Sequence, residues 1–135
     1  MNQRTLAIIK PDAVLRRFIG HVLAKMELEG FEIVDMKMVH LTKEQAKELY
    51  KVHKDKPFYE DQTDFMSSGP CVMMVLEGND VIKKYRRLMG ATDYKKAEPF
   101  TIRYELATDI RHNIVHGSDS EETANFEINF FNSIK

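Results

Sequence analysis

The hydrophobic pattern of this chain changes its period several times, and the order of those changes is what most limits the fold. Short apolar runs bounded by turn residues are typical of buried strands. In one further stretch Val34, Met36 and Met38 alternate with Asp35 and Lys37, which predicts a half-buried strand. Four segments are therefore predicted as strands: residues 5–9, 31–40, 72–76 and 113–116.

Apolar residues at helical spacing fill the first two intervals between these strands. The first interval predicts one helix over residues 14–26, which Gly30 ends. In the second interval Thr42 and Gln45 form a capping box that begins a helix, and a second short helical pattern covers residues 59–66. A helical hairpin is therefore expected between the second and third strands.

Helix caps and apolar spacing also predict two helices in the second half of the chain. Asn79 is the predicted cap of a helix over residues 81–89, and Ser120 is the predicted cap of the last helix. Residues 90–110 show no sustained periodicity, so a long loop is expected before the last strand.

This element order predicts an α+β fold. It is the βαββαβ order of a ferredoxin-like sandwich with a four-stranded antiparallel sheet, an inserted helical hairpin and a long loop before the last strand. A length of 135 residues predicts a single domain over residues 1–135. Because this fold hosts many activities, the function must be argued from particular residues.

Composition excludes several classes of function. The formal net charge of −1 argues against a nucleic-acid-binding surface, which normally shows as a basic excess. The longest strongly apolar run, residues 71–76, is too short to cross a bilayer, so we expect no membrane partner and a cytoplasmic location. Cys71 lies within that run, where a small buried hydrophobe is favoured over a reactive thiol.

One histidine stands in a segment suited to anion chemistry. His116 is followed by Gly117 and by three small polar residues that lead into the last predicted helix. The glycine allows the backbone to approach a ligand closely, and a helix N-terminus favours negative charge. An imidazole is itself a nucleophile, especially when a neighbouring group fixes its tautomer.

Glu127 interrupts the apolar face of the last helix. It falls at helical spacing with Ala124, Ile128 and Phe131, and helical side chains lean toward the helix N-terminus, so it should reach back toward Ser118 and His116. Two interpretations stay open at this point, and they are compatible. The carboxylate either orients the histidine or caps the preceding turn.

Other residues carry weaker signals. Phosphate chemistry needs cations, and Lys10, Arg86 and Arg103 lie at the edges of predicted elements, whereas Phe58 is either a stacking platform or a core aromatic. No phosphate-binding glycine loop or protein-kinase catalytic loop is present, and no metal site is predicted. Four other histidines are interpreted as structural or solvated: His21, His40, His53 and His112.

Together these residues resemble the nucleoside diphosphate kinase family along essentially the whole chain. The segments TLAIIKPDAV, MSSGP, LEG, LMGAT and NIVHGSDS occur in the order found in that family, and Glu127 follows them. Their positions are residues 5–14, 66–70, 76–78, 88–92 and 113–120.

The resemblance implies a ping-pong reaction through a phosphohistidine on His116. The histidine takes the γ-phosphoryl group of a nucleoside triphosphate such as ATP and later gives it to a nucleoside diphosphate. By the same resemblance Arg86, Thr92 and Arg103 hold the phosphates. Mg²⁺ is the implied cofactor and is bound through phosphate oxygens, in keeping with its preference for retained waters.

The remaining roles come from the same resemblance. Lys10 and Asn113 bind the ribose hydroxyls, with Lys10 also near the transferring group, and Tyr50 lines the site beside it. Ser118 and Glu127 orient the imidazole. Phe58 stacks on the base, and since every base has a π-face, this contact tolerates all of them.

Three positions depart from the family pattern. Gln62 stands where a leucine often helps to sandwich the base, so base affinity is expected to differ. Tyr94 and Phe100 lie in segments where the family usually reads Asn-Pro-Ala and Pro-Gly-Thr, in a loop that helps to form subunit contacts. The resemblance implies a homo-oligomer, a tetramer or hexamer built from dimers, and these changes bear on that assembly.

Two functions from other classes are alternatives to the enzyme. A ferredoxin-like nucleotide-binding or regulatory module without catalysis predicts binding without turnover. A nucleic-acid-binding domain is compatible with the fold, but the charge balance gives it no basic face. Every matched catalytic position is intact, which favours the enzyme.

Overall fold

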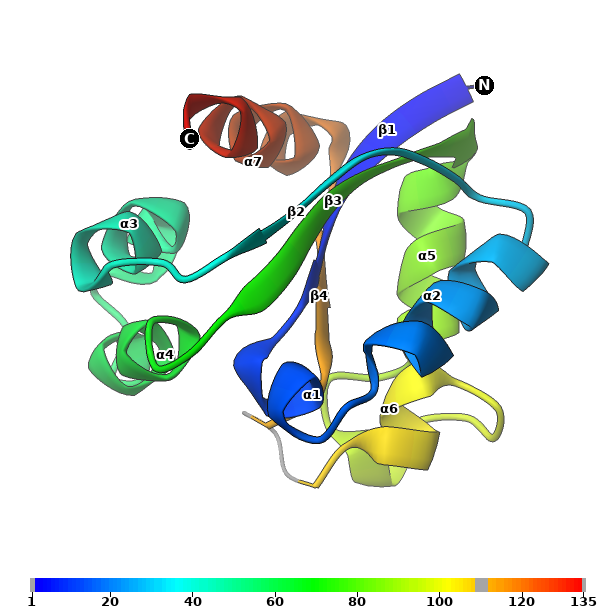
Figure 1. Cartoon of the computed structure of the whole chain (residues 1–135), viewed down its shortest axis with the longest axis horizontal. Helices are drawn as coiled ribbons and strands as arrows, with labels where there is room; N and C mark the ends of the chain where they lie inside the picture. Colours follow the sequence, from blue (N-terminus) through cyan, green and yellow to red (C-terminus); the bar gives the residue numbers. More distant parts are fainter. Residues whose placement is uncertain (1, 109–111, 135) are drawn as a thin grey trace.

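The computed structural model describes residues 2–108 and 112–134. Its centre is a four-stranded antiparallel sheet in the order β2-β3-β1-β4, which confirms the predicted fold class (Figure 1). The strands are β1 (Asn2–Ile9), β2 (Glu32–Val39), β3 (Cys71–Asn79) and β4 (Val115–Gly117).

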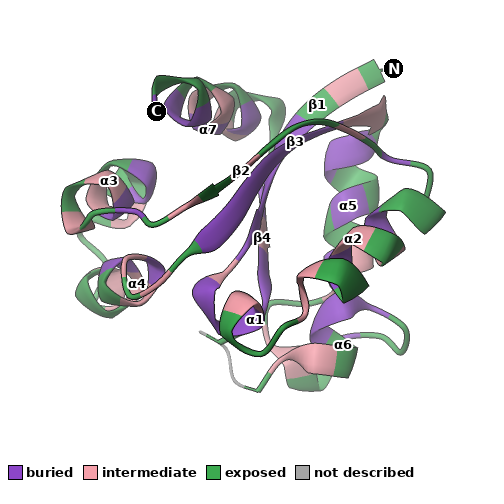
Figure 2. Ribbon diagram, in the orientation of Figure 1, coloured by how far each residue is buried: buried purple, intermediate pink, exposed green. Residues whose placement is uncertain are grey.

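The two central strands owe their position to continuous apolar sequence. β1 and β3 pair along their whole length, from Asn2 opposite Asn79 to Ile9 opposite Val72. Both faces of this pair are buried, and Figure 2 shows the two strands buried over most of their length. A strand that is covered on both faces needs apolar residues at successive positions, which is why these segments lack alternation. Within this core, burial raises the pKa of the Cys71 thiol to about 12.

Helices cover both faces of the sheet (Figure 1). One face packs against α2 and α5, and the other packs against α7 and the hairpin of α3 and α4. The helices are α1 (Pro11–Leu15), α2 (Ile19–Leu28), α3 (Lys43–Leu49), α4 (Tyr59–Met66), α5 (Val81–Met89), α6 (Ile102–Leu106) and α7 (Glu121–Ser133), with 3₁₀ turns η1 (Lys51–His53) and η2 (Tyr94–Lys96). Within the described ranges, none of the helices is both long and apolar enough to cross a membrane.

The single helix predicted over residues 14–26 is wrong, because the chain forms α1 and α2 with a break between them. Arg17 takes a φ of 65° at the break, in the left-handed region that non-glycine residues seldom adopt. The amide of Phe18 donates to the carbonyl of Ala13 and closes α1. Both helices pack on the same core, so apolar spacing continues across a break that neither glycine nor proline marks.

Two smaller predictions also need correction. Asn79 ends β3, and Asp80, with a φ of 53°, is the residue that precedes α5. The loop expected over residues 90–110 contains η2 and α6 within its described part, residues 90–108. Helix α6 has only five residues, too few for periodicity to appear, although Thr101 caps it by accepting from the amide of Tyr104.

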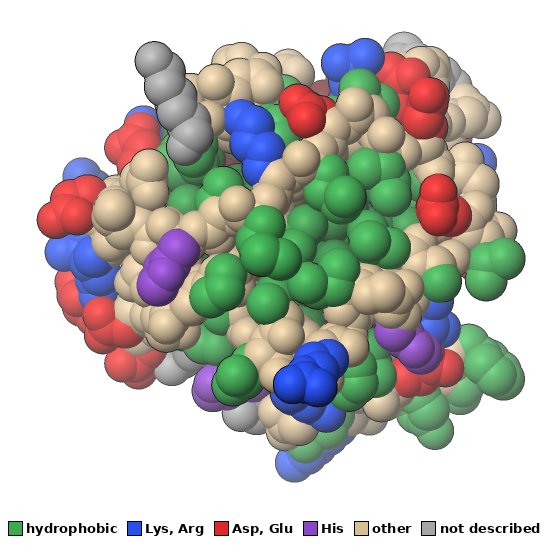
Figure 3. Space-filling model, in the orientation of Figure 1, with side chains coloured by type: hydrophobic (Ala, Val, Ile, Leu, Met, Phe, Trp, Pro, Cys, Tyr) green, Lys and Arg blue, Asp and Glu red, His purple; other side chains and the backbone are tan. Residues whose placement is uncertain are grey.

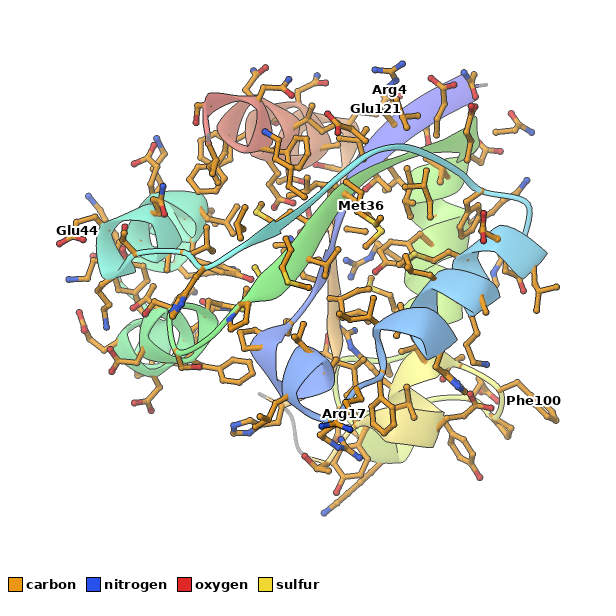
Figure 4. All side chains as sticks on the ribbon, in the orientation of Figure 1. Arg4, Arg17, Met36, Glu44, Phe100 and Glu121 are labelled. Carbon is orange, nitrogen blue, oxygen red and sulfur yellow. The ribbon has the colours of Figure 1, made fainter. Side chains whose placement is uncertain are left out.

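The strand predicted over residues 31–40 is confirmed as β2, but its apolar side is not buried. Val34, Met36 and Met38 are 39%, 49% and 61% exposed. A bulge lies at Val34, between the pairs Ile33–Leu76 and Asp35–Val75, and β2 is an edge strand. Figure 3 shows a hydrophobic area over this part of the sheet, and Figure 4 shows Met36 in front of it. An apolar strip therefore lies open along the edge of the sheet.

Candidate active site

A pocket of about 440 Å³ opens where β4, α4, α5 and the segment after β1 meet. Its wall combines cations and amides on one side with aromatic residues on the other. Seven of the residues predicted to form the site line it: Lys10, Phe58, Arg86, Thr92, Arg103, Asn113 and His116. The other three, Tyr50, Ser118 and Glu127, lie behind this wall.

His116 is held by the carboxylate of Glu127. The Nε2 atom of the imidazole lies 2.9 Å from Oε1 of Glu127, and Ser118 Oγ donates to the same oxygen at 2.8 Å. Ser118 is in turn fixed to β1, because Leu6 N donates to its hydroxyl at 3.3 Å and its own amide donates to Leu6 O. A carboxylate accepts hydrogen bonds, so Nε2 carries the proton and the lone pair is on Nδ1.

The start of α7 explains why Glu127 reaches the histidine. Ser120 and Thr123 form a capping box at the N-terminus of the helix, which confirms the cap predicted at Ser120. Glu127 is about two turns into the helix and is only 9% exposed. A buried carboxylate needs partners, and those of Glu127 are His116 and Ser118.

Tyr50 also packs against the histidine. Its ring meets the imidazole edge to face with the ring centres 5.7 Å apart. Its hydroxyl is buried and has no hydrogen-bond partner within the described part of the chain, and burial raises the pKa of this phenol well above its ordinary value. Tyr50 therefore presents a neutral O–H group beside the pocket.

Gly117 lines the pocket, and it also has a packing role that the sequence did not predict. A Cβ at this position would lie 2.6 Å from the ring of Tyr85 and 2.8 Å from Met89 Cε. Tyr85 Oη donates to the carbonyl of His116 at 3.1 Å. The glycine makes room for α5 to pack under β4, and this packing fixes the backbone of the histidine.

Lys10 and Asn113 are neighbours in the pocket wall. Lys10 Nζ donates to Asn113 Oδ1 at 2.7 Å, although the two residues are far apart in sequence. Antiparallel pairing of β1 with β4 brings them together, because Ile9 pairs with Val115. The pair presents one ammonium and one amide group at the pocket wall.

Arg103 both lines the pocket and organises it. Its guanidinium donates to the carbonyls of Gly90, Asn113 and Val115 at 3.1, 3.4 and 2.8 Å. A guanidinium has five N–H donors, so about two remain for a ligand. Burial lowers the pKa of Arg103 from its ordinary value, but arginine keeps its charge at neutral pH. Arg86 lies nearby, with its Nη1 3.5 Å from the carbonyl of Gly117.

The aromatic side of the pocket contains residues that the sequence did not reveal. His53, which was interpreted as structural or solvated, lines the pocket next to Phe58, with ring centres 5.4 Å apart. Phe65 also lines it. Tyr50 and His53 are three residues apart, about one helical turn, and this spacing was the available signal. Gln62 lies in the same wall, and its Oε1 is buried with no hydrogen-bond partner among residues 2–108 and 112–134.

The remaining histidines lie outside this pocket. His21 is 3.4 Å from Glu105, and His40 contacts the carbonyl of Ser67. The ring of His112 packs against Phe65. In residues 2–108 and 112–134, no cluster of three or more His, Cys, Asp or Glu side chains could hold a metal ion.

The departures in the loop before β4 lie away from the pocket wall. Tyr94 begins η2, and Phe100 is 81% exposed with a φ of 72°. Figure 4 shows the Phe100 side chain pointing away from the body of the molecule. Lys25 Nζ donates to its carbonyl at 3.0 Å and ties the loop to α2.

Comparison with known proteins places these features in a family. The nucleoside diphosphate kinase family model matches residues 3–134. The nucleoside diphosphate kinase of Desulfosudis oleivorans is 56% identical over 134 residues, which cover 98% of this chain and 96% of that protein. The protein of the same name from Thiobacillus denitrificans is 55% identical over 129 residues, which cover 96% and 91%.

Solved structures agree with the sequence comparison. The Aquifex aeolicus nucleoside diphosphate kinase superimposes with a TM-score of 0.95 at 44% identity, over 97% of this chain and 95% of that one. The Halobacterium salinarum nucleoside diphosphate kinase, solved in complex with CDP, gives a TM-score of 0.93 at 41% identity, over 97% and 88%. This chain belongs to the nucleoside diphosphate kinase family.

Proposed function

We propose that this chain is a nucleoside diphosphate kinase whose phosphoryl carrier is His116. The observation that carries the proposal is the imidazole held by Glu127 through Nε2 at the base of a cationic pocket, with Nδ1 left as the nucleophile. Family membership and the names of the close relatives support the same activity.

The reaction has two symmetrical steps. The Nδ1 lone pair of His116 forms a bond to the γ-phosphorus, while the bond to the β-phosphate oxygen breaks and its electron pair leaves with the nucleoside diphosphate. A terminal phosphate oxygen of a second nucleoside diphosphate then attacks the phosphohistidine and regenerates the imidazole. Glu127 stabilises the positive charge that develops on the imidazole during attack.

The other pocket residues position the substrate. Arg86, Thr92 and Arg103 hold the phosphates, and Lys10 with Asn113 holds the ribose hydroxyls, as their places in the wall allow. Preorganised donors of this kind supply most of the catalysis in phosphoryl transfer. Tyr50 supports the imidazole, and Ser118 acts through Glu127.

Mg²⁺ fits this pocket as an ion carried by the nucleotide. The wall is rich in cations, and Asp119 is a carboxylate within it, which matches a metal held mainly by phosphate oxygens and water. When bound, the ion neutralises charge on the phosphates. Family membership supports the use of magnesium nucleotides.

Phe58 is proposed to stack on the base. Stacking is tolerant of sequence because every base has a π-face, so purine and pyrimidine nucleotides should both be substrates. The complex of the Halobacterium salinarum relative with CDP supports nucleotide binding in this family. Gln62 lines the pocket close to the proposed base site, so affinity is expected to vary among bases.

We also propose how the chain is divided into domains and how its copies assemble. Residues 1–135 form one catalytic domain, and the exposed strip of Val34, Met36 and Met38 on the edge strand β2 is proposed to join two copies in the dimers of a tetramer or hexamer. An open apolar sheet edge normally acquires a partner. The cytoplasmic location stays a prediction from the sequence.

The labelling of the protein by γ-labelled ATP and Mg²⁺ tests the proposed reaction. We expect label that is stable in alkali and labile in acid, discharged by ADP, GDP, CDP and UDP alike. His116→Ala should abolish the labelling. Label retained in that variant would contradict the assignment of the carrier, and nucleotide binding without any labelling of the wild type would indicate a catalytically inactive module.

A further inference from the structure

The residue between Asn113 and Val115 has a strained backbone. Ile114 has a φ of 78° and is fully buried. The amide of Val115 donates to the carbonyl of Asn113 at 2.9 Å, so Ile114 is the centre of a γ-turn of the rare kind with positive φ. This conformation is unfavourable for a β-branched residue, so surrounding contacts must impose it.

The turn after β1 supplies those contacts. The amide of Ile114 donates to Asp12 Oδ2 at 3.2 Å, and its carbonyl accepts from the amide of Lys10 at 2.8 Å. Both polar groups of the strained residue are thus satisfied by a segment that is remote in sequence. The Lys10 contact uses backbone atoms, whereas the contact to the Ile114 amide depends on the side chain of Asp12.

Asp12 lies behind the pocket and not in its wall. It is 8% exposed and borders a separate cavity of about 440 Å³, together with Pro11, Phe65 and Pro70. Burial raises the pKa of this carboxyl, which means that keeping it ionised is costly in the folded protein. Because Asp12 does not line the pocket, its ionised side chain must serve a purpose other than direct contact with the substrate.

We propose that Asp12 is a positioning residue for phosphoryl transfer, which holds the strained turn at Ile114 and thereby aligns Asn113 and His116. This inference rests on the proposed function of the pocket. The turn lies between the two residues, with Asn113 bonded to Lys10 Nζ on one side and His116 bonded to Glu127 on the other. If the Ile114 amide loses its acceptor, relaxation of φ rotates the peptide planes on both sides.

Two substitutions of similar size separate the hydrogen bond from the charge. Asp12→Asn removes the charge but keeps an oxygen that accepts from Ile114 N, and Asp12→Leu removes both. We expect Asp12→Leu to lower kcat and the single-turnover rate of His116 phosphorylation about tenfold. Asp12→Asn should stay within about threefold of the wild type, because it keeps the oxygen that accepts from Ile114 N. Loss of one positioned contact is worth roughly tenfold in rate.

Val22→Ala is the matched control for lost stability. It removes buried methyl groups from α2, outside the pocket, so it should lower the Tm while kcat measured below the transition stays at the wild-type value. Equal kcat values in Asp12→Leu and Asp12→Asn, or a loss in Val22→Ala equal to that in Asp12→Leu, would overturn the positioning role. If Asp12→Leu does not fold, Asp12→Ala is compared in its place, and a wild-type rate in either variant refutes the proposal.

The same experiment distinguishes this inference from the proposed function. If wild-type protein takes no label from γ-labelled ATP, the proposed function fails. If the wild type is labelled and the two Asp12 variants do not differ, the reaction stands and the positioning role fails.

Discussion

At the scale of single residues, several buried polar groups of the site satisfy one another. Glu127 has His116 and Ser118 as partners, and Arg103 is bonded to three backbone carbonyls. The approach of Glu127 to His116 follows from helical spacing and the lean of helical side chains, so the sequence was sufficient to predict it. The bonds of Arg103 join segments with no shared pattern, so no local signal pointed to them.

Asp12→Asn should stabilise the protein at neutral pH. Burial is the main reason that the folded-state pKa of this carboxyl is raised. Its protonated form therefore contributes stability that is fully present below the unfolded pKa, about 3.9, and is lost as pH rises through the folded pKa. Asparagine imitates the protonated form at every pH, so the variant should have the higher Tm at pH 7.

Thermal melts of both proteins between pH 3 and pH 8 check this prediction. The difference in Tm should shrink toward zero at the acid end of the series, where the wild-type carboxyl is protonated in both states. A wild type that is the more stable of the two at pH 7 would show that the partners of Asp12 outweigh its burial.

At the scale of elements, the sequence predicted those that pack with a clear period and missed those that do not. The four strands and the caps at Thr42 and Ser120 follow from local pattern and chemistry, but the last strand begins at Val115 and not at Asn113, because Ile114 has a positive φ. The break at Arg17 was invisible because both flanking helices share one core. The open side of β2 was also invisible, because alternation indicates two faces without telling which neighbour covers either one.

Gly117→Ala should destabilise the contact between β4 and α5. The added methyl group would lie 2.6 Å from the ring of Tyr85, and overpacking of this kind costs about 1–3 kcal/mol. Displacement of the Tyr85 ring would also disturb its bond to the carbonyl of His116, so kcat should fall together with the Tm.

Gly20→Ala is the control for the glycine substitution. Gly20 lies in α2, and a Cβ there would have nothing within 4 Å. Alanine at such a position should raise stability by about 0.4–1 kcal/mol. Calorimetry measures the Tm of the two variants. An unchanged Tm in Gly117→Ala would mean that Tyr85 moves aside at little cost.

At the scale of the whole molecule, the fold was predictable because the order of strands and helices admits few topologies. The exposed apolar surface was not, since the sequence alone does not show that Val34, Met36 and Met38 lie open on β2. Likewise, the outward position of Phe100 became clear only from the course of the loop.

Charge placed on the apolar strip should separate the subunits. Introduction of Met36→Glu and Met38→Glu together puts two carboxylates on the proposed interface between the copies of a dimer, so the mass from light scattering should fall below that of the wild-type assembly. Val52→Glu, at a position that is 75% exposed on η1, should leave the wild-type mass unchanged. A double variant with the wild-type mass would place the subunit contact elsewhere.

The capped start of α7 also determines where the chain tolerates changes in length. Glu127 meets His116 only because the number of residues after the Ser120 cap brings it to the inner side of the helix. One inserted residue between these two positions would turn the carboxylate by about 100° around the helix axis, away from the imidazole. Natural or engineered insertions should therefore be absent from this segment, whereas the surface loop around Phe100 is open to them.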